Sequence, residues 1–153
     1  MISNDFIGEE LYKKIVEVMP IPTVDVLVFN SDFSKTLLFC RNNEPLKNSH
    51  YSLGGRLNMG ESFLDCAKRK LKEEINFVVN LDKLIQVGTI SEYFVEGNKK
   101  FHFVNIYFSM VLNENNKLKL DNQHSGFKWF DIKEVGIHPY LKEKISNCIK
   151  NKK

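Results

Sequence analysis

The stretch from Ser52 to Phe77, SLGGRLNMGESFLDCAKRKLKEEINF, limits the folds open to this chain more than any other segment. Its second half predicts a helix over 62–76 that has one apolar stripe. The stripe recurs at helical spacing and consists of Leu64, Ala67, Leu71 and Ile75. An amphipathic helix of this kind must bury its stripe against another layer, so the chain needs a sheet on which the helix can dock.

Strand-like segments on both sides of this helix supply that sheet. Extended segments are expected at 23–30, 35–41, 84–95, 100–112 and within 118–131, and further helices at about 4–18 and 139–150. The first two strands are expected to form a hairpin near the middle of the sheet. No repeat or linker divides the 153 residues, which suit a single domain over 1–153. We expect an α+β fold, an α/β/α sandwich with a mixed central β-sheet.

Composition excludes several classes of function. The 22 basic and 19 acidic residues are interspersed, so a net charge of +3 gives no electrostatic reason to expect nucleic-acid binding. The N-terminal segment has no signal-peptide core, and no apolar run reaches the length of a membrane span. Cys40, Cys66 and Cys148 are odd in number and widely spaced, with no CxxC pair, which disfavours a zinc site and a disulfide framework. A cytoplasmic protein that binds no membrane is expected.

The charged residues of the central helix allow two interpretations. Arg69–Glu73 and Lys70–Glu74 are both i,i+4 pairs, and such pairs are ordinary on a helix surface. The preceding glycine turn favours chemistry instead, because glycines let the backbone approach a ligand closely.

This stretch contains oxygen ligands that suit a metal ion and arginines that suit a diphosphate. The carbonyl of Gly55 and the carboxylate of Glu74 are hard oxygen donors of the kind that Mg²⁺ prefers. Arg56 and Arg69 supply forked donors for phosphate oxygens. The stretch therefore favours a site that holds a metal ion and a diphosphate.

Residues 55–77 resemble the Nudix box, whose pattern is G-x5-E-x7-R-E-U-x-E-E-x-G-U with U an aliphatic residue. The matching residues are Gly55, Glu61, Arg69, Leu71, Glu73, Glu74 and Phe77. Lys70 stands in place of the first glutamate after the arginine, and Asn76 in place of the late glycine. The resemblance implies a Nudix fold and a metal-dependent hydrolase. Lys70 is either a solvent-facing partner of Glu74 or a fixed positive charge that replaces a metal ion.

The chain also resembles the GDP-mannose mannosyl hydrolases, a Nudix branch without that glutamate, over about residues 20–140. The segments that carry the resemblance are IPTVDVLVFN, CRNNEP, GGR and DNQHSGFKWF. It implies that Asp25 and Arg41 contact the substrate and that Arg56, with Arg69, stabilises the leaving diphosphate. Asp25 has a structural hydrogen bond as its alternative role. Phe103 stands where the branch has a substrate-contacting tyrosine, so the identity of the sugar stays open.

By the same resemblance His124 is the general base, and Gln123 completes a metal site with Gly55 and Glu74. Glu73 is a further candidate ligand. Without the resemblance, the Gln123-His124 pair is a polar turn before a strand. The cofactor implied is Mg²⁺, with Mn²⁺ as the alternative, and the assembly implied is a homodimer.

Three functions remain. The first is hydrolysis of a GDP-sugar, GDP-mannose or a related GDP-hexose, at the anomeric carbon, which gives GDP and the free sugar with inversion. The second is a pyrophosphohydrolase that cleaves a nucleoside diphosphate-X to a nucleoside monophosphate and X-phosphate, which the Glu73-Glu74 pair favours. The third is a catalytically silent module that binds nucleotide sugars.

Overall fold

The computed structural model describes residues 7–116, 118 and 124–152, with residues 124 and 125 described by their backbone alone. The helices are α1 (Glu9–Val18), α2 (Phe63–Ile75), α3 (Pro139–Lys150) and the short 3₁₀ helix η1 (Leu81–Lys83). The strands are β1 (Ile21–Phe29), β2 (Lys35–Arg41), β3 (His50–Tyr51), β4 (Leu53–Arg56), β5 (Ile85–Glu96), β6 (Lys99–Val111) and β7 (His124–Asp131).

The strands form one mixed sheet, as predicted. Its main path is β3-β2-β1-β6-β5, while β4 pairs with β1 and β7 pairs with β2. The β1–β6 pair is parallel and the other pairs are antiparallel. The predicted hairpin between 23–30 and 35–41 is present, with Val28 opposite Leu37, and β1 lies in the middle of the sheet.

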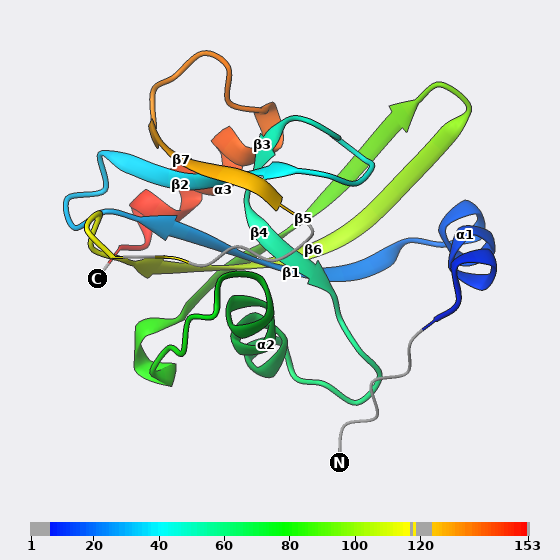
Figure 1. Cartoon of the computed structure of the whole chain (residues 1–153), viewed down its shortest axis with the longest axis horizontal. Coiled ribbons are helices and arrows are strands. Elements are labelled where there is room, and N and C mark those ends of the chain that lie inside the picture. Colours follow the sequence, from blue (N-terminus) through cyan, green and yellow to red (C-terminus); the bar gives the residue numbers. More distant parts are fainter. Residues whose placement is uncertain (1–6, 117, 119–123, 153) are drawn as a thin grey trace.

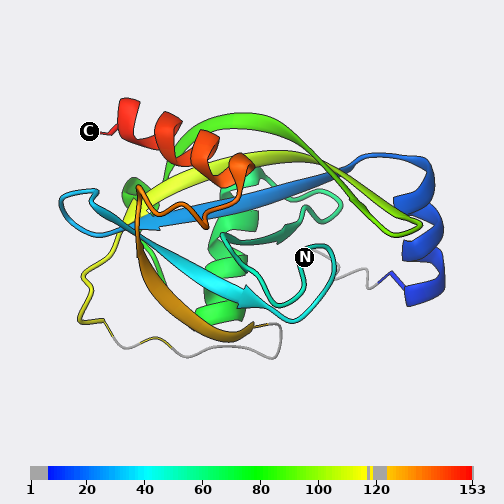
Figure 2. The same cartoon turned by 90° about the horizontal axis from the view of Figure 1, so that it is seen from above.

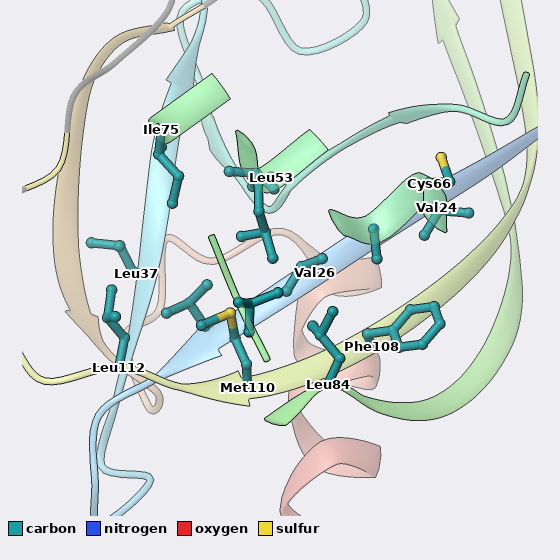
Figure 3. Packing of buried hydrophobic residues seen from close by; sticks show 14 of the residues in the cluster. Val24, Val26, Leu37, Leu53, Cys66, Ile75, Leu84, Phe108, Met110 and Leu112 are labelled. Atoms are coloured by element: carbon teal, nitrogen blue, oxygen red, sulfur yellow. The ribbon is translucent and has the colours of Figure 1, made fainter. Parts of the chain in front are cut away.

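Helices cover both faces of this sheet (Figures 1 and 2), which confirms the predicted sandwich. Alternate residues of β1 point to opposite faces. Val24, Val26 and Val28 join the core cluster under α2, which Figure 3 shows from close by. Leu27 and Phe29 join a second cluster under α3.

Helix α2 begins and ends at residues that suit helix termini, Ser62 and Asn76. The Ser62 hydroxyl accepts a hydrogen bond from the backbone N–H of Asp65 and so caps the first turn. Asn76 ends the helix in the left-handed conformation, with φ of 51°. Asparagine is one of the few residues besides glycine that adopt this conformation at low cost. The replacement of the late box glycine by Asn76 is therefore compatible with the same helix end.

The segment YSLGG before α2 is extended, as its sequence predicts, so the glycine pair lies in a strand and not in the turn assigned to it. Gly54 and Gly55 belong to β4, where they stand opposite Asp25 and Val24 of β1. The segment is extended because its backbone pairs with the central strand, a long-range interaction that local glycine content does not reveal.

Helix α1 lies at one end of the sheet, beside the β5–β6 hairpin (Figure 1). In the structure it begins at Glu9, later than the predicted residue 4, and none of its residues is buried. Leu11 and Val18 are exposed. The homodimer and the cytoplasmic location stay predictions. None of the helices in the described part of the chain has the length and apolar character needed to cross a membrane.

Candidate active site

Five residues predicted to act on the substrate or the metal line a single cleft. They come from β1, β2, β4 and β6, and they are Asp25, Arg41, Gly55, Arg56 and Phe103. The central position of β1 brings these segments together, because β4 and β6 both pair with it directly. The fold thus gathers into one place residues that are up to 78 positions apart in the sequence (Asp25 to Phe103).

Asp25 enters the cleft because its neighbour in the sheet is a glycine. A Cβ atom on Gly54 would lie 2.0 Å from Asp25 Oδ1 and 2.5 Å from the carbonyl oxygen of Val24. Any larger residue at Gly54 would force the Asp25 carboxylate to move. Gly54 is therefore needed for close approach and not for backbone freedom.

Below the cleft, Asp25 belongs to a buried polar network. Its Oδ2 accepts hydrogen bonds from the Ser52 hydroxyl at 2.6 Å and from Lys144 Nζ at 3.0 Å. Lys144 comes from α3, is fully buried, and also donates to Asn105 Oδ1 at 3.2 Å. Two roles were considered for Asp25, a structural hydrogen bond and contact with the substrate. Asp25 makes structural hydrogen bonds and also lines the cleft.

Glu92 of β5 adds a second carboxylate to this network, 3.4 Å from Lys144 Nζ. The Tyr51 hydroxyl donates a hydrogen bond to it. Burial raises the pKa of Glu92 above its ordinary value; Lys144 opposes the rise and nearby Asp25 adds to it. Because Glu92 also lines the cleft, a buried carboxyl of altered acidity faces any ligand bound there.

The other side of the cleft is basic and aromatic. Arg41 Nε donates to the carbonyl oxygen of Pro45 at 2.8 Å, which orients its side chain. Arg56 follows the glycine pair on β4, and Tyr12 reaches the cleft from α1. Burial raises the pKa of Tyr12, and Arg56 and Arg41 oppose that rise. Two guanidinium groups at one cleft suit the oxygens of a diphosphate.

The three glutamates of the box are all engaged in ion pairs along α2. Arg69 Nε lies 2.6 Å from Glu61 Oε1, and Arg69 Nη1 lies 3.2 Å from Glu73 Oε2. Arg69 Nη2 donates to the carbonyl oxygen of Arg56 at 3.0 Å. Burial is the largest effect on the pKa of Glu61 and raises it, but hydrogen bonds from Arg69 and from the backbone N–H of Asn58, together with the charge of Arg69, hold that pKa below its ordinary value. Arg69 therefore holds the segment before α2 in position.

Lys70 pairs with Glu74, with Nζ 2.6 Å from Oε1, and lies 3.6 Å from Glu73 Oε2. The Lys70 side chain is only 7% exposed and that of Glu74 is 0% exposed. The prediction of a Lys70 that faces solvent was wrong. A Cβ atom on Gly55 would lie 2.7 Å from Lys70 Cε, so the lysine packs directly against the second glycine.

These pairings decide how well the site fits a metal ion. Gly55 and Glu74 both lie beside Lys70, whose ammonium already neutralises the Glu74 carboxylate. Across the part of the chain that the structure describes, no three His, Cys, Asp or Glu side chains form a group able to hold a metal ion. The described residues do not fit a divalent ion held by the protein alone. Gln123, the remaining predicted ligand, lies outside the described residues.

The backbone of His124 opens β7 and stands opposite Arg41 of β2. The predicted base therefore belongs to a strand next to one that contributes to the cleft. Its role as a base stays a prediction, as do the metal-binding roles of Glu73, Glu74 and Gln123.

The site residues that sequence reasoning did not assign include Lys144, Tyr51 and Tyr12. One signal was available for Lys144, because it lies on the buried stripe of α3 between Leu141 and Cys148. A lysine at an apolar position of a helix predicts a buried partner of opposite charge. Tyr51 and Tyr12 gave no comparable signal.

Residues 19–151 match the family model described as the NUDIX domain, which covers most of the chain. The chain belongs to the Nudix family. Among curated relatives, the low-salt glycan biosynthesis protein Agl8 of Haloferax volcanii is 29% identical over 139 residues, covering 88% of this chain and 86% of that protein.

Solved structures share the Nudix fold at low sequence identity. The MutT protein of Methanosarcina mazei superposes with a TM-score of 0.68 at 21% identity, covering 89% of this chain and 99% of that one. The NUDIX domain of Shewanella oneidensis NrtR, solved with ADP-ribose, gives a TM-score of 0.68 at 19% identity, covering 94% and 98%.

Proposed function

We propose that this Nudix hydrolase cleaves a GDP-sugar, GDP-mannose or a related GDP-hexose, at the anomeric carbon and releases GDP and the free sugar with inversion. One observation carries the proposal. Arg41 and Arg56, the arginines predicted to bind the diphosphate, share a cleft with the buried carboxyls of Asp25 and Glu92, whereas the box glutamates form ion pairs with Arg69 and Lys70.

The two sides of the cleft suit the two halves of such a substrate. Arg41 and Arg56 would bind the diphosphate and stabilise the negative charge that develops on it as the C–O bond breaks. Asp25 and Glu92 would accept hydrogen bonds from sugar hydroxyls. Phe103 would pack against the sugar, since it lines the same cleft without a hydroxyl of its own.

The reaction needs a water molecule, a base and a stabilised leaving group. The water attacks the anomeric carbon, its proton passes to the base, and the bonding electrons leave with the diphosphate oxygen. We assign the base to His124, because histidine is the residue type whose ordinary pKa lies closest to neutral pH. Attack opposite the leaving group inverts the anomeric centre. Arg69 would act as a positioning residue through its contacts with Glu61 and the Arg56 carbonyl.

Mg²⁺, with Mn²⁺ as the alternative, stays a prediction for this reaction. In proteins Mg²⁺ keeps several waters and is often shared between a carboxylate and substrate phosphates. An ion that arrives with the diphosphate is the form of metal use that the described residues allow.

Two relatives support a nucleotide-sugar substrate. The Haloferax relative is named for glycan biosynthesis, a process that consumes activated sugars. The Shewanella domain was solved with ADP-ribose, a nucleoside diphosphate joined to a sugar. Both proteins have low sequence identity to this chain. They therefore support a class of substrate, the nucleotide sugars, and do not indicate which sugar or base it carries.

The second candidate function is cleavage of the phosphoanhydride to a nucleoside monophosphate and X-phosphate. The retained Glu73 and Glu74 favour it, and their pairing with Arg69 and Lys70 opposes it. A silent binding module is the third candidate, and Lys70 at a glutamate position of the box is the feature that favours it.

The deciding experiment is hydrolysis of GDP-mannose in ¹⁸O-labelled water with and without Mg²⁺, followed by phosphorus and proton NMR and mass spectrometry. The proposal expects GDP without label and labelled mannose that appears first as the inverted anomer. GMP and mannose 1-phosphate, with the label on phosphorus, would establish the second function. If GDP-mannose is not cleaved, other nucleotide sugars are assayed; tight binding without turnover of any would establish the third.

A further inference from the structure

A continuous series of ion pairs runs along the box from Glu61 to Glu74. It passes through Arg69, Glu73 and Lys70, with successive N···O distances of 2.6, 3.2, 3.6 and 2.6 Å. The two ends of the series, Glu61 and Glu74, are the most deeply buried carboxylates in it, at 1% and 0% exposure of their side chains. Each buried end has a basic side chain as its partner.

The ion pair of Lys70 with Glu74 differs from an ordinary pair on a helix surface, because Lys70 is buried against Gly55. The ideal Cβ position on Gly55 lies 2.7 Å from Lys70 Cε and 3.0 Å from Nζ. The ammonium group therefore lies against the backbone of the strand residue that lines the cleft. It occupies the space between Gly55 and Glu74, the two groups whose oxygens would otherwise suit a divalent cation.

The space beside Glu74 favours a single cation, the Lys70 ammonium, over the ammonium together with a divalent ion. A fully buried carboxylate is costly unless an opposite charge accompanies it, and Lys70 meets that need without any ion from solution. A divalent ion would have to lose part of its hydration and also displace an ammonium that is itself buried. The lysine would then lose its partner and be left close to a second positive charge.

We propose that Lys70 is the resident counter-ion of Glu74 and replaces a protein-held divalent ion, so that the free protein does not bind a metal at its Nudix box. Any divalent ion that takes part in turnover is then held mainly by the substrate's diphosphate. The last statement rests on the proposed function, because it assumes a diphosphate substrate. The first does not, since it concerns the protein without ligand.

The test is a Mn²⁺ titration of the nucleotide-free protein, read by electron paramagnetic resonance of the free ion. Wild-type protein should leave the Mn²⁺ signal unchanged at micromolar concentrations of the ion. Lys70→Glu should create a site, with affinity raised by roughly 10–100-fold, the range over which groups around metal ligands change affinity. Lys72→Glu is the matched control, because it makes the same charge change on an exposed position of the same helix and should behave as wild type.

Tight Mn²⁺ binding by wild-type protein that Glu74→Gln abolishes would overturn the proposal. So would a folded Lys70→Glu variant that gains no affinity, because the lysine would then not be what excludes the ion. Should Lys70→Glu not fold, NMR of the wild-type lysine ammonium groups decides the matter. The proposal expects the Lys70 signal to survive Mn²⁺, and selective broadening of that signal would contradict it.

This readout is separate from the test of the substrate. It uses neither nucleotide nor turnover, so GMP among the reaction products would remove the proposed function and leave the Lys70 proposal standing. Conversely, Mn²⁺ binding at Glu74 would remove the Lys70 proposal and leave GDP-sugar hydrolysis untouched.

Discussion

Lys144 Nζ lies 3.0 Å from Asp25 Oδ2, and this contact joins the closing helix α3 to the central strand β1 directly beneath the cleft. The same ammonium lies 3.4 Å from Glu92 and 4.9 Å from the centre of the Tyr51 ring. One fully buried lysine therefore stabilises two carboxylates that would otherwise repel each other. Lys144 thus offsets the negative charge of Asp25 and Glu92, which line the cleft, although it does not line the cleft itself.

Replacing Lys144 with methionine should destabilise the fold by about 3–5 kcal/mol, because it leaves two buried carboxylates without their cation. Urea denaturation at neutral pH measures the loss. Lys142→Met, an exposed lysine on the same helix, should change the free energy of unfolding far less. A Lys144→Met variant as stable as the Lys142→Met control would show that the buried pair contributes nothing.

The raised pKa of Glu92 predicts how stability depends on pH. The folded state binds this proton more tightly than the unfolded state, whose pKa is near the ordinary 4.5. The stabilisation is thus fully present below pH 4.5 and is lost as pH rises through the folded-state pKa. Glu92→Gln removes this loss, so the variant should gain stability relative to wild type as pH increases.

Denaturation of both proteins at several pH values from about 4.5 upward gives this difference directly. The exposed Glu143→Gln, beside Lys144 on α3, serves as the control and should track wild type at every pH. A constant difference between wild type and Glu92→Gln would mean that Glu92 titrates alike in both states.

Much of the fold could be predicted because its elements have strong local patterns. The strand 35–41 and the helix 139–150 have the predicted bounds, and α2 differs from its predicted range by one residue at each end. The extended conformation of Gly54 and Gly55 was predicted, but their pairing with β1 could not be, because it is a long-range interaction. Short strands that depend on a long-range partner have no periodicity of their own.

The site was predicted in part for a similar reason. Asp25 stands out because it interrupts an apolar strand, and Arg56 because it follows the glycine pair, whereas Arg41 was assigned only through the family resemblance. Lys70 was predicted either to face solvent as a partner of Glu74 or to replace a metal ion. It lies on the buried side of α2 with Cys66 and Glu74, at a spacing of four residues. Its burial results from the ion pair with Glu74 and the open space at Gly55, which are tertiary features.

Gly54→Ala should weaken both stability and activity. The added methyl group would lie 2.0 Å from Asp25 Oδ1, so the carboxylate must leave its contacts with Ser52 and Lys144. Overpacking of this kind costs roughly 1–3 kcal/mol. Gly136→Ala is the control, because nothing lies within 4 Å of its added Cβ atom. Equal melting temperatures and equal kcat/KM for the two variants would contradict the tight contact at Gly54.

His124→Ala should lower kcat by about 10²–10⁴-fold with little change in KM, because loss of a general base affects the transition state more than substrate binding. Steady-state kinetics with the substrate that the product assay identifies gives both constants. His102→Ala is the matched control, since His102 lies on β6 and contacts Ser91 at an exposed position. A fall of only a few-fold, equal to that of His102→Ala, would show that His124 is not the base. The base would then have to come from the cleft itself, where Glu92 is a buried carboxyl with a raised pKa.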